Sequence, residues 1–266
     1  MPVSALTAWI TRWPLPKSLR SPLIQFVFGR LFRADVSEAE APLESYPTLV
    51  AFFSRRLKPG LRTFASWSTQ VLSPCDGTLT GVQKIEDGTL FQAKGMPYAL
   101  RDFLGSQDPT PFQNGTAVTI YLAPKDYHRV HVPLSARLLR AERLRGSVYP
   151  VNAFTTHRVP GVFSKNRRLI FSFETVTGEF YGLCMVAALN VSRMPVTFDL
   201  AWGNQKGIRE YQKDLEQGED LAAFELGSTV VLLFPAGAFQ GTAHPGKIRA
   251  GQPLGNWFPV AKSISH

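Results

Sequence analysis

A serine hydroxyl directly follows a glycine at the start of an apolar run, near the end of the 266-residue chain. The run, residues 230–234, is short, rich in β-branched side chains and closed by Pro235, which predicts a buried strand. Gly227 permits backbone conformations with φ > 0, so the Gly227–Ser228 peptide can be bent or strained at the start of that strand. On its own, Gly-Ser-Thr before a strand is typical of a turn. The reactivity of Ser228 therefore depends on which residues accompany it.

Two earlier stretches carry side chains suited to acid–base chemistry. Asp76 lies in the Ser-Pro-Cys-Asp-Gly sequence of residues 73–77, which in isolation is typical of a turn. His128 and His131 form a His-x-x-His pair within residues 126–133. Such a pair is half of a metal site, but no third ligand cluster accompanies it, so we expect no metal. A serine, a histidine and an aspartate are the residue types of base-assisted nucleophilic attack.

Together these stretches resemble phosphatidylserine decarboxylase. The Leu-Gly-Ser-Thr sequence of residues 226–229 and the blocks at 73–77 and 126–133 occur in that family's order, and the resemblance spans residues 73–234. Members of that family cut themselves between the Gly and the Ser, and the Ser becomes an N-terminal pyruvoyl group. The resemblance implies cleavage between Gly227 and Ser228 into two fragments, residues 1–227 and 228–266, which remain associated.

The resemblance also assigns roles to residues of this protein. Asp76, His131 and Ser228 would form the self-cleavage triad: His131, held by Asp76, removes the proton from Ser228, whose oxygen attacks the carbonyl carbon of Gly227. Elimination and loss of ammonia would leave a covalent pyruvoyl group at position 228. That carbonyl would form a Schiff base with the amine of phosphatidylserine, and His128 would act in the decarboxylation that gives phosphatidylethanolamine. The implied activity is a lyase of phospholipid biosynthesis.

Other classes of protein fit parts of the pattern. A hydrolase triad uses the same residue types, but Ser228 lacks the Gly-x-Ser-x-Gly elbow. Cys75 is a poor nucleophile because Asp76 beside it raises the pKa of a thiol. A lipid-binding module without self-processing would not need the intact triad. The substrate could also differ, because another amino acid or amino-lipid could reach a pyruvoyl carbonyl. Ala187 and Ser192 stand where the family often has glycine.

The charge of the protein predicts an anionic partner. The formal net charge is +9, which fits nucleic acid, an anionic membrane surface or an acidic substrate. Residues 1–33 contain arginine, lysine, tryptophan and phenylalanine but no acidic residue, which favours docking at a membrane interface over nucleic-acid binding. The alternative is a helical flap packed on the core. We expect a peripheral protein at the cytoplasmic face of a bacterial-type cell membrane, and the resemblance implies a homodimer of protomers.

The elements that position these residues indicate an α+β fold. We expect a helical membrane-docking region, residues 1–65, with short helices broken at Pro14, Pro16 and Pro22 and another helix over residues 46–57. A mostly antiparallel β catalytic domain, residues 66–266, should follow. Its expected strands are residues 77–82, 117–122, 169–173, 180–187 and 230–234, with a short strand and turn at 247–251.

Overall fold

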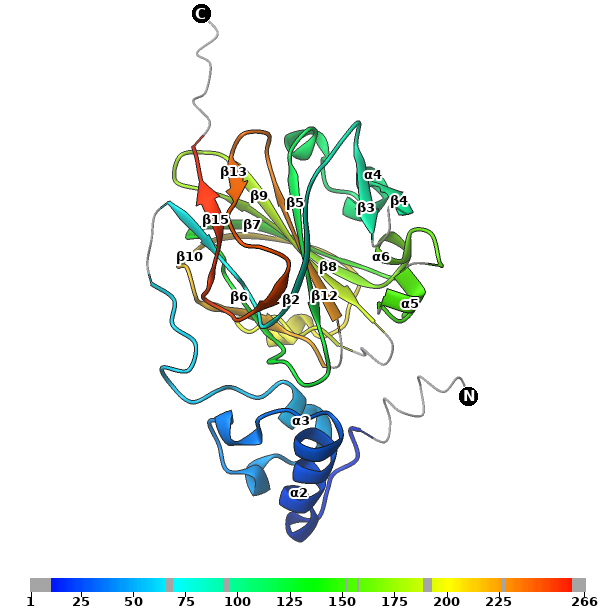
Figure 1. Ribbon diagram of the computed structural model, residues 1–266, viewed down its shortest axis with the longest axis vertical. Helices are drawn as coiled ribbons and strands as arrows, with labels where there is room; N and C mark the ends of the chain where they lie inside the picture. The colour runs from blue at the N-terminus through cyan, green and yellow to red at the C-terminus, as the bar shows by residue number, and fades with distance from the viewer. Residues whose placement is uncertain are drawn as a thin grey trace, which may run out of the picture.

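An eight-stranded antiparallel sheet is the centre of the fold (Figure 1). The computed structural model describes residues 11–65, 69–92, 96–151, 153–156, 158–188, 193–225 and 228–259. Across the sheet the order is β10 (Gly207–Leu215), β7 (Ala136–Leu144), β8 (Arg168–Glu174), β9 (Phe180–Ala187), β12 (Ser228–Phe234), β5 (Thr116–Leu122), β2 (Gly77–Lys84) and β14 (Gly246–Ile248).

Strand β12 lies inside this sheet, between β9 and β5. All seven of its residues are buried, as the continuous apolar sequence predicts for a strand covered on both faces. The five strands expected from the sequence and their mostly antiparallel pairing are confirmed. The short strand expected near residue 247 is present as β14.

Smaller sheets flank this one. A three-stranded sheet has the order β1 (Gln70–Leu72), β15 (Pro253–Trp257) and β13 (Phe239–Gly241). The other two sheets pair β6 (Arg129–His131) with β11 (Asp220–Ala223), and β3 (Thr89–Gln92) with β4 (Met96–Ala99). Short helices complete this part of the protein: α4 (Leu100–Leu104), η5 (Thr110–Phe112), α5 (Ala153–Thr156), α6 (Val162–Lys165) and η6 (Leu200–Trp202).

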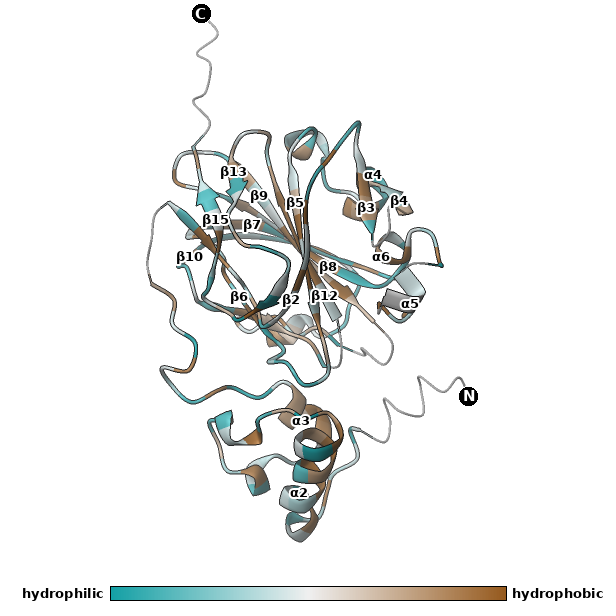
Figure 2. Cartoon of the chain, viewed as in Figure 1, coloured by the Kyte–Doolittle hydropathy of each residue, from teal (hydrophilic) through white to brown (hydrophobic). Residues whose placement is uncertain are grey.

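The N-terminal region is helical and has its own small apolar core. Its elements are α2 (Lys17–Ile24), the π-helix η1 (Gln25–Leu31), the 3-10 helices η2 (Val36–Glu38) and η3 (Leu43–Ser45), and α3 (Leu49–Phe53). Ile24, Phe28, Phe52 and Phe53 are buried together in this core. Figures 1 and 2 show the region below the β domain, with apolar residues along its helices. None of the helices in the described residues is long and apolar enough to cross a membrane.

Two expectations about these helices are wrong. Pro22 does not break the helix but lies exposed inside α2, and the backbone then continues as a π-helix, with the Phe32 N–H bonding the Val27 carbonyl at 3.0 Å, five residues back. Pro22 has no N–H to donate, and it is tolerated at this exposed position of α2. The helix expected over residues 46–57 spans only Leu49–Phe53, because the Thr48 hydroxyl caps its start by accepting the Ala51 N–H at 3.0 Å.

Candidate active site

The three sequence motifs meet at one end of the large sheet. Thr78 of β2 and Thr229 of β12 both lie opposite Tyr121 of β5, one on each side. Asp76, just before β2, and Ser228, the first residue of β12, therefore flank the same end of β5. The approach of β2 to β5 requires glycine at position 77, because a Cβ there would lie 2.5 Å from the Tyr121 carbonyl oxygen.

Backbone hydrogen bonds bring the histidine motif to the same place. The His131 N–H donates to the Pro74 carbonyl at 2.8 Å, two residues before Asp76. The Phe224 N–H donates to the His128 carbonyl at 2.9 Å, four residues before Ser228. Segments far apart in the sequence thus surround one site.

Ser228 is fully buried, opposite Leu122 on one side and Ala187 on the other. Its hydroxyl has no hydrogen-bond partner among the described residues. Gly227, the other half of the predicted cleavage site, lies outside those residues. A buried hydroxyl without a partner costs about 1–3 kcal/mol. The Thr229 hydroxyl is also unpartnered among the described residues, so Ser228 is distinguished by its place directly after Gly227 in the sequence.

His131 is held by both ring nitrogens. Nδ1 lies 2.9 Å from the Gly218 carbonyl oxygen, which can only accept, so Nδ1 carries the proton. Nε2 is then the basic nitrogen and accepts from the Tyr127 hydroxyl at 3.1 Å. Burial lowers the pKa of His131 below its ordinary value, although the nearby Asp220 carboxylate opposes this effect. The ring is therefore a neutral base at neutral pH.

The carboxylate of Asp76 binds an arginine rather than a histidine. Arg62 donates from Nε and Nη2 to its two oxygens, at 2.8 and 2.5 Å, and the Ala250 N–H donates at 2.9 Å. Arg62 also bonds both oxygens of Glu38, at 3.3 and 3.1 Å. Among the described residues no hydrogen bond joins Asp76 to His131 or His131 to Ser228. The triad remains a prediction whose members share one end of the sheet.

His128 lies fully buried beside the same segments. Its Nδ1 bonds the Asp126 carbonyl at 2.8 Å, so the lone pair is on Nε2, which has no partner in the part of the protein that the structure describes. Its ring packs against Phe53 with centroids 4.0 Å apart. Burial lowers the pKa of His128 to about 3, so the ring is uncharged at neutral pH.

The N-terminal helical region packs against this site. Besides the Phe53–His128 contact, the Ser54 carbonyl accepts from Arg129 Nη1 at 3.1 Å. Arg12 forms an ion pair with Glu225, shortly before Ser228 in the sequence. In Figure 1 the helices lie below the end of the β domain that holds β6 and β12.

Sequence reasoning missed the partners that orient these groups. Tyr127 lies inside the histidine block, whereas Gly218 is 87 residues from His131 in the sequence and has no local signal. No motif in the sequence links Arg62 to Asp76, 14 residues away. Cys75 is buried, which raises the pKa of its thiol and agrees with its rejection as a nucleophile. Ser192 lies outside the described residues.

Comparison with known proteins gives one consistent family. A family model described as phosphatidylserine decarboxylase matches residues 49–256. The phosphatidylserine decarboxylase proenzyme of Halorhodospira halophila is 37% identical over 262 residues, covering 95% of this sequence and 89% of that protein. The proenzyme of Acidovorax ebreus is 38% identical over 258 residues, covering 90% of this sequence and 88% of that protein. The proenzyme of Anaeromyxobacter sp. is 36% identical over 258 residues, covering 92% of this sequence and 90% of that protein.

Proposed function

The protein belongs to the phosphatidylserine decarboxylase family, and on that premise we propose that it is a self-cleaving proenzyme that converts phosphatidylserine to phosphatidylethanolamine. One observation carries the proposal beyond family membership. Ser228, at the family's cleavage position, is fully buried with no hydrogen-bond partner for its hydroxyl among the described residues, at the sheet end where the Asp76 and His131 motifs also lie.

The first proposed step is attack of the Ser228 oxygen on the carbonyl carbon of Gly227. His131 accepts the hydroxyl proton at Nε2, the nitrogen that its bond to Gly218 leaves basic. For this the Tyr127 hydroxyl must release Nε2 or relay the proton to it. Because the serine attacks its own preceding peptide, proximity supplies up to about 7–11 kcal/mol in a well-oriented case.

The peptide bond breaks and the Ser228 nitrogen takes up a proton, leaving an ester between Gly227 and the Ser228 oxygen. Removal of the Ser228 α-proton then breaks the bond between Cβ and Oγ and releases Gly227 as a carboxylate. The dehydroalanine left at position 228 takes up one water and loses one ammonia, which gives the pyruvoyl group. In the proposal Asp76 supports this chemistry by holding residues 73–77 in place. The Pro74 carbonyl of that motif accepts the His131 N–H.

The residues around position 228 leave a polar partner available for a pyruvoyl group, because the buried His128 Nε2 has no other partner among the described residues. The group supplies a carbonyl that accepts the electrons released when the substrate carboxylate leaves as carbon dioxide. His128 Nε2 would accept the proton that the substrate ammonium loses and return it to the carbon that the carboxylate has left. The strands around β12 exclude water from the reaction.

We also propose that the helical region docks on an anionic membrane surface, at the cytoplasmic face of a bacterial-type cell membrane. Four large apolar side chains there are more than half exposed: Trp13 at 54%, Leu19 at 54%, Phe26 at 58% and Leu31 at 64%. Lysine and arginine side chains on the same segment complement anionic lipid headgroups. The proposal that processed protomers form a homodimer rests on the family resemblance alone.

The activity is tested with purified protein and phosphatidylserine in detergent micelles. Carbon dioxide and phosphatidylethanolamine should appear in equal amounts, and the Ser228→Ala variant should produce neither. Release of fatty acid or headgroup by the wild-type protein would instead indicate a hydrolase. Lipid binding without turnover would indicate a binding module.

A further inference from the structure

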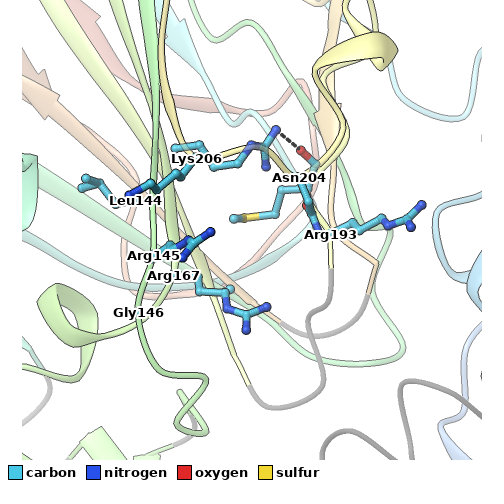
Figure 3. A pocket seen from close by; sticks show the side chains of 10 residues that line it. Leu144, Arg145, Gly146, Arg167, Arg193, Asn204 and Lys206 are labelled. Carbon is cyan, nitrogen blue, oxygen red and sulfur yellow. Dashed lines mark hydrogen bonds between the residues drawn. The ribbon is translucent and has the colours of Figure 1, made fainter.

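A basic pocket lies at the same end of the sheet as Ser228, by the ends of β7 and β9 and the start of β8 (Figure 3). Its volume is about 370 Å³, and its described lining includes no acidic residue. Five cationic side chains line it: Arg143, Arg145, Arg167, Arg193 and Lys206. Such a concentration of positive charge attracts an anion.

The strongest evidence for a ligand is Arg143, which is only 6% exposed. Its Nη2 donates to the Met194 carbonyl at 3.1 Å, but Nε and Nη1 are buried with no partner among the described residues. Burial lowers the pKa of Arg143 to about 10, so the group is still charged at neutral pH. A buried cation with open donors is costly unless an anion pairs with it.

A neighbouring arginine shows what a structural role looks like. Arg168 is also buried, but its guanidinium donates to backbone carbonyls, among them those of Phe103 at 3.0 Å and Asp102 at 3.0 Å. Among the three buried arginines described, Arg55 also has an unpartnered Nε, but Arg143 leaves two donors, Nε and Nη1, without a partner.

The pocket adjoins the proposed reaction centre. Ala187 lines it and is the ladder partner of Ser228 in β12, and such partners have Cα atoms about 4.5–5.5 Å apart. The Arg193 carbonyl also accepts the Glu225 N–H at 3.2 Å. In an amino-phospholipid two carbon atoms separate the amine from the phosphate ester, so an amine held at position 228 places the phosphate close by.

We propose that this basic pocket binds the phosphodiester of the phospholipid substrate while the amine reaches position 228. The assignment rests on the proposed decarboxylase function and adds the residues that select the headgroup. Arginine suits this role because its planar fork pairs with two phosphate oxygens at once.

The test uses exposed residues of the rim, because Arg143 also packs over Trp202 at 4.6 Å and its replacement would mix binding with stability. The rim variant is Arg145→Gln/Arg167→Gln. The matched control, Lys84→Gln/Arg101→Gln, removes the same charge from exposed residues that do not line the pocket. All proteins are first shown by mass to be processed. Turnover is then measured with phosphatidylserine in neutral detergent micelles, and binding of glycerophosphoserine and of inorganic phosphate is measured by calorimetry.

The rim variant should raise KM about tenfold or more with little change in kcat, and should weaken glycerophosphoserine binding similarly. The control pair should change neither. An unchanged KM, or an equal rise in both variants, would overturn the proposal. Phosphate binding that is lost in the rim variant at unchanged KM would identify a free-phosphate site instead. If the wild type has no decarboxylase activity but binds glycerophosphoserine through the rim, the proposed function fails and the pocket assignment survives.

Discussion

His131 is held between an acceptor and a donor, which decides where its proton lies. The Gly218 carbonyl keeps the proton on Nδ1 and leaves Nε2 as the base. Gly218 has φ +90°, and a Cβ there would lie 2.6 Å from Phe64, so glycine is required for this arrangement. The main-chain oxygen of Gly218 thus orients the His131 ring, a role that a carboxylate has in a Ser-His-Asp triad.

The pH dependence of self-cleavage follows from this environment. Burial lowers the pKa of His131, so its neutral form should persist below pH about 6.5, the ordinary value for histidine. We expect the cleavage rate to fall with acid, with a midpoint below that value. The measurement follows uncut protein recovered from inclusion bodies and refolded across a pH series. The His244→Gln variant, altered at an exposed histidine, should keep the same profile; a midpoint at or above 6.5 would contradict this role of His131.

Arg62 should stabilise the site through its two carboxylate partners. It neutralises Asp76 and Glu38 together, and the Arg62 and Asp76 side chains are only 8% and 11% exposed. Removing one partner of a largely buried ion pair costs about 3–5 kcal/mol. Arg62→Met should lower the free energy of unfolding by about that amount and slow cleavage. Urea unfolding in a Ser228→Ala background, where every molecule is uncut, measures the first effect.

The control for Arg62 is Arg56→Gln, since Arg56 is 59% exposed and only 3.6 Å from Asp220. An exposed pair of this kind contributes about 0–1 kcal/mol. Equal effects of the two substitutions would contradict a special role for Arg62.

At the scale of elements, the strands were predictable and the helices only in part. The apolar runs 230–234 of β12 and 181–187 of β9 stay buried on both faces, so their composition alone indicates strand. The helix at Leu49–Phe53 is delimited by side-chain bonds of Thr48 and Ser54, which periodicity over residues 46–57 does not reveal. Periodicity also does not reveal the π-helix after Pro22, whose Phe28 is buried with Ile24 in the small core.

The residues of the site were likewise only partly predictable from the sequence. Asp76, His131 and Ser228 were found because each lies in a short recognisable motif. Gly218, Arg62 and the basic pocket depend on contacts between segments distant in the sequence, and these arise only when the sheet forms.

The α2–η1 segment should bind membranes through its exposed apolar side chains. The double variant Phe26→Ser/Leu31→Ser removes two of them, and burial of such a side chain is worth about 1.5–3 kcal/mol. Retention on anionic vesicles in a flotation assay should fall at least about tenfold, while self-cleavage is unchanged. The control is Val176→Ser, since Val176 is 99% exposed on the β8–β9 turn. Undiminished retention of the double variant would show that this segment is not the docking surface.

For the whole molecule, the arrangement of strands has a consequence after cleavage. The small fragment, residues 228–266, would contribute β12 between two strands of the large fragment, and β14 and β15 pair with β2 and β1. The Ala250 N–H also holds Asp76 across the two fragments. A strand buried on both sides cannot leave without disrupting the core.

The two fragments should therefore remain together. We expect them to co-elute in gel filtration under native conditions and to separate only in denaturant. Loss of the small fragment from a native column would contradict the arrangement of β12 as a shared central strand.

The most direct test of the central claim is the intact mass of the purified protein under denaturing conditions. We expect residues 1–227 as one species and residues 228–266 as another, the second lighter by one ammonia than its amino-acid sequence requires. Ser228→Ala should remain a single polypeptide, whereas Thr229→Val, which removes the neighbouring buried hydroxyl, should still be cut. A single full-length species from the wild-type sequence would contradict self-cleavage at Ser228 and the activity that depends on it.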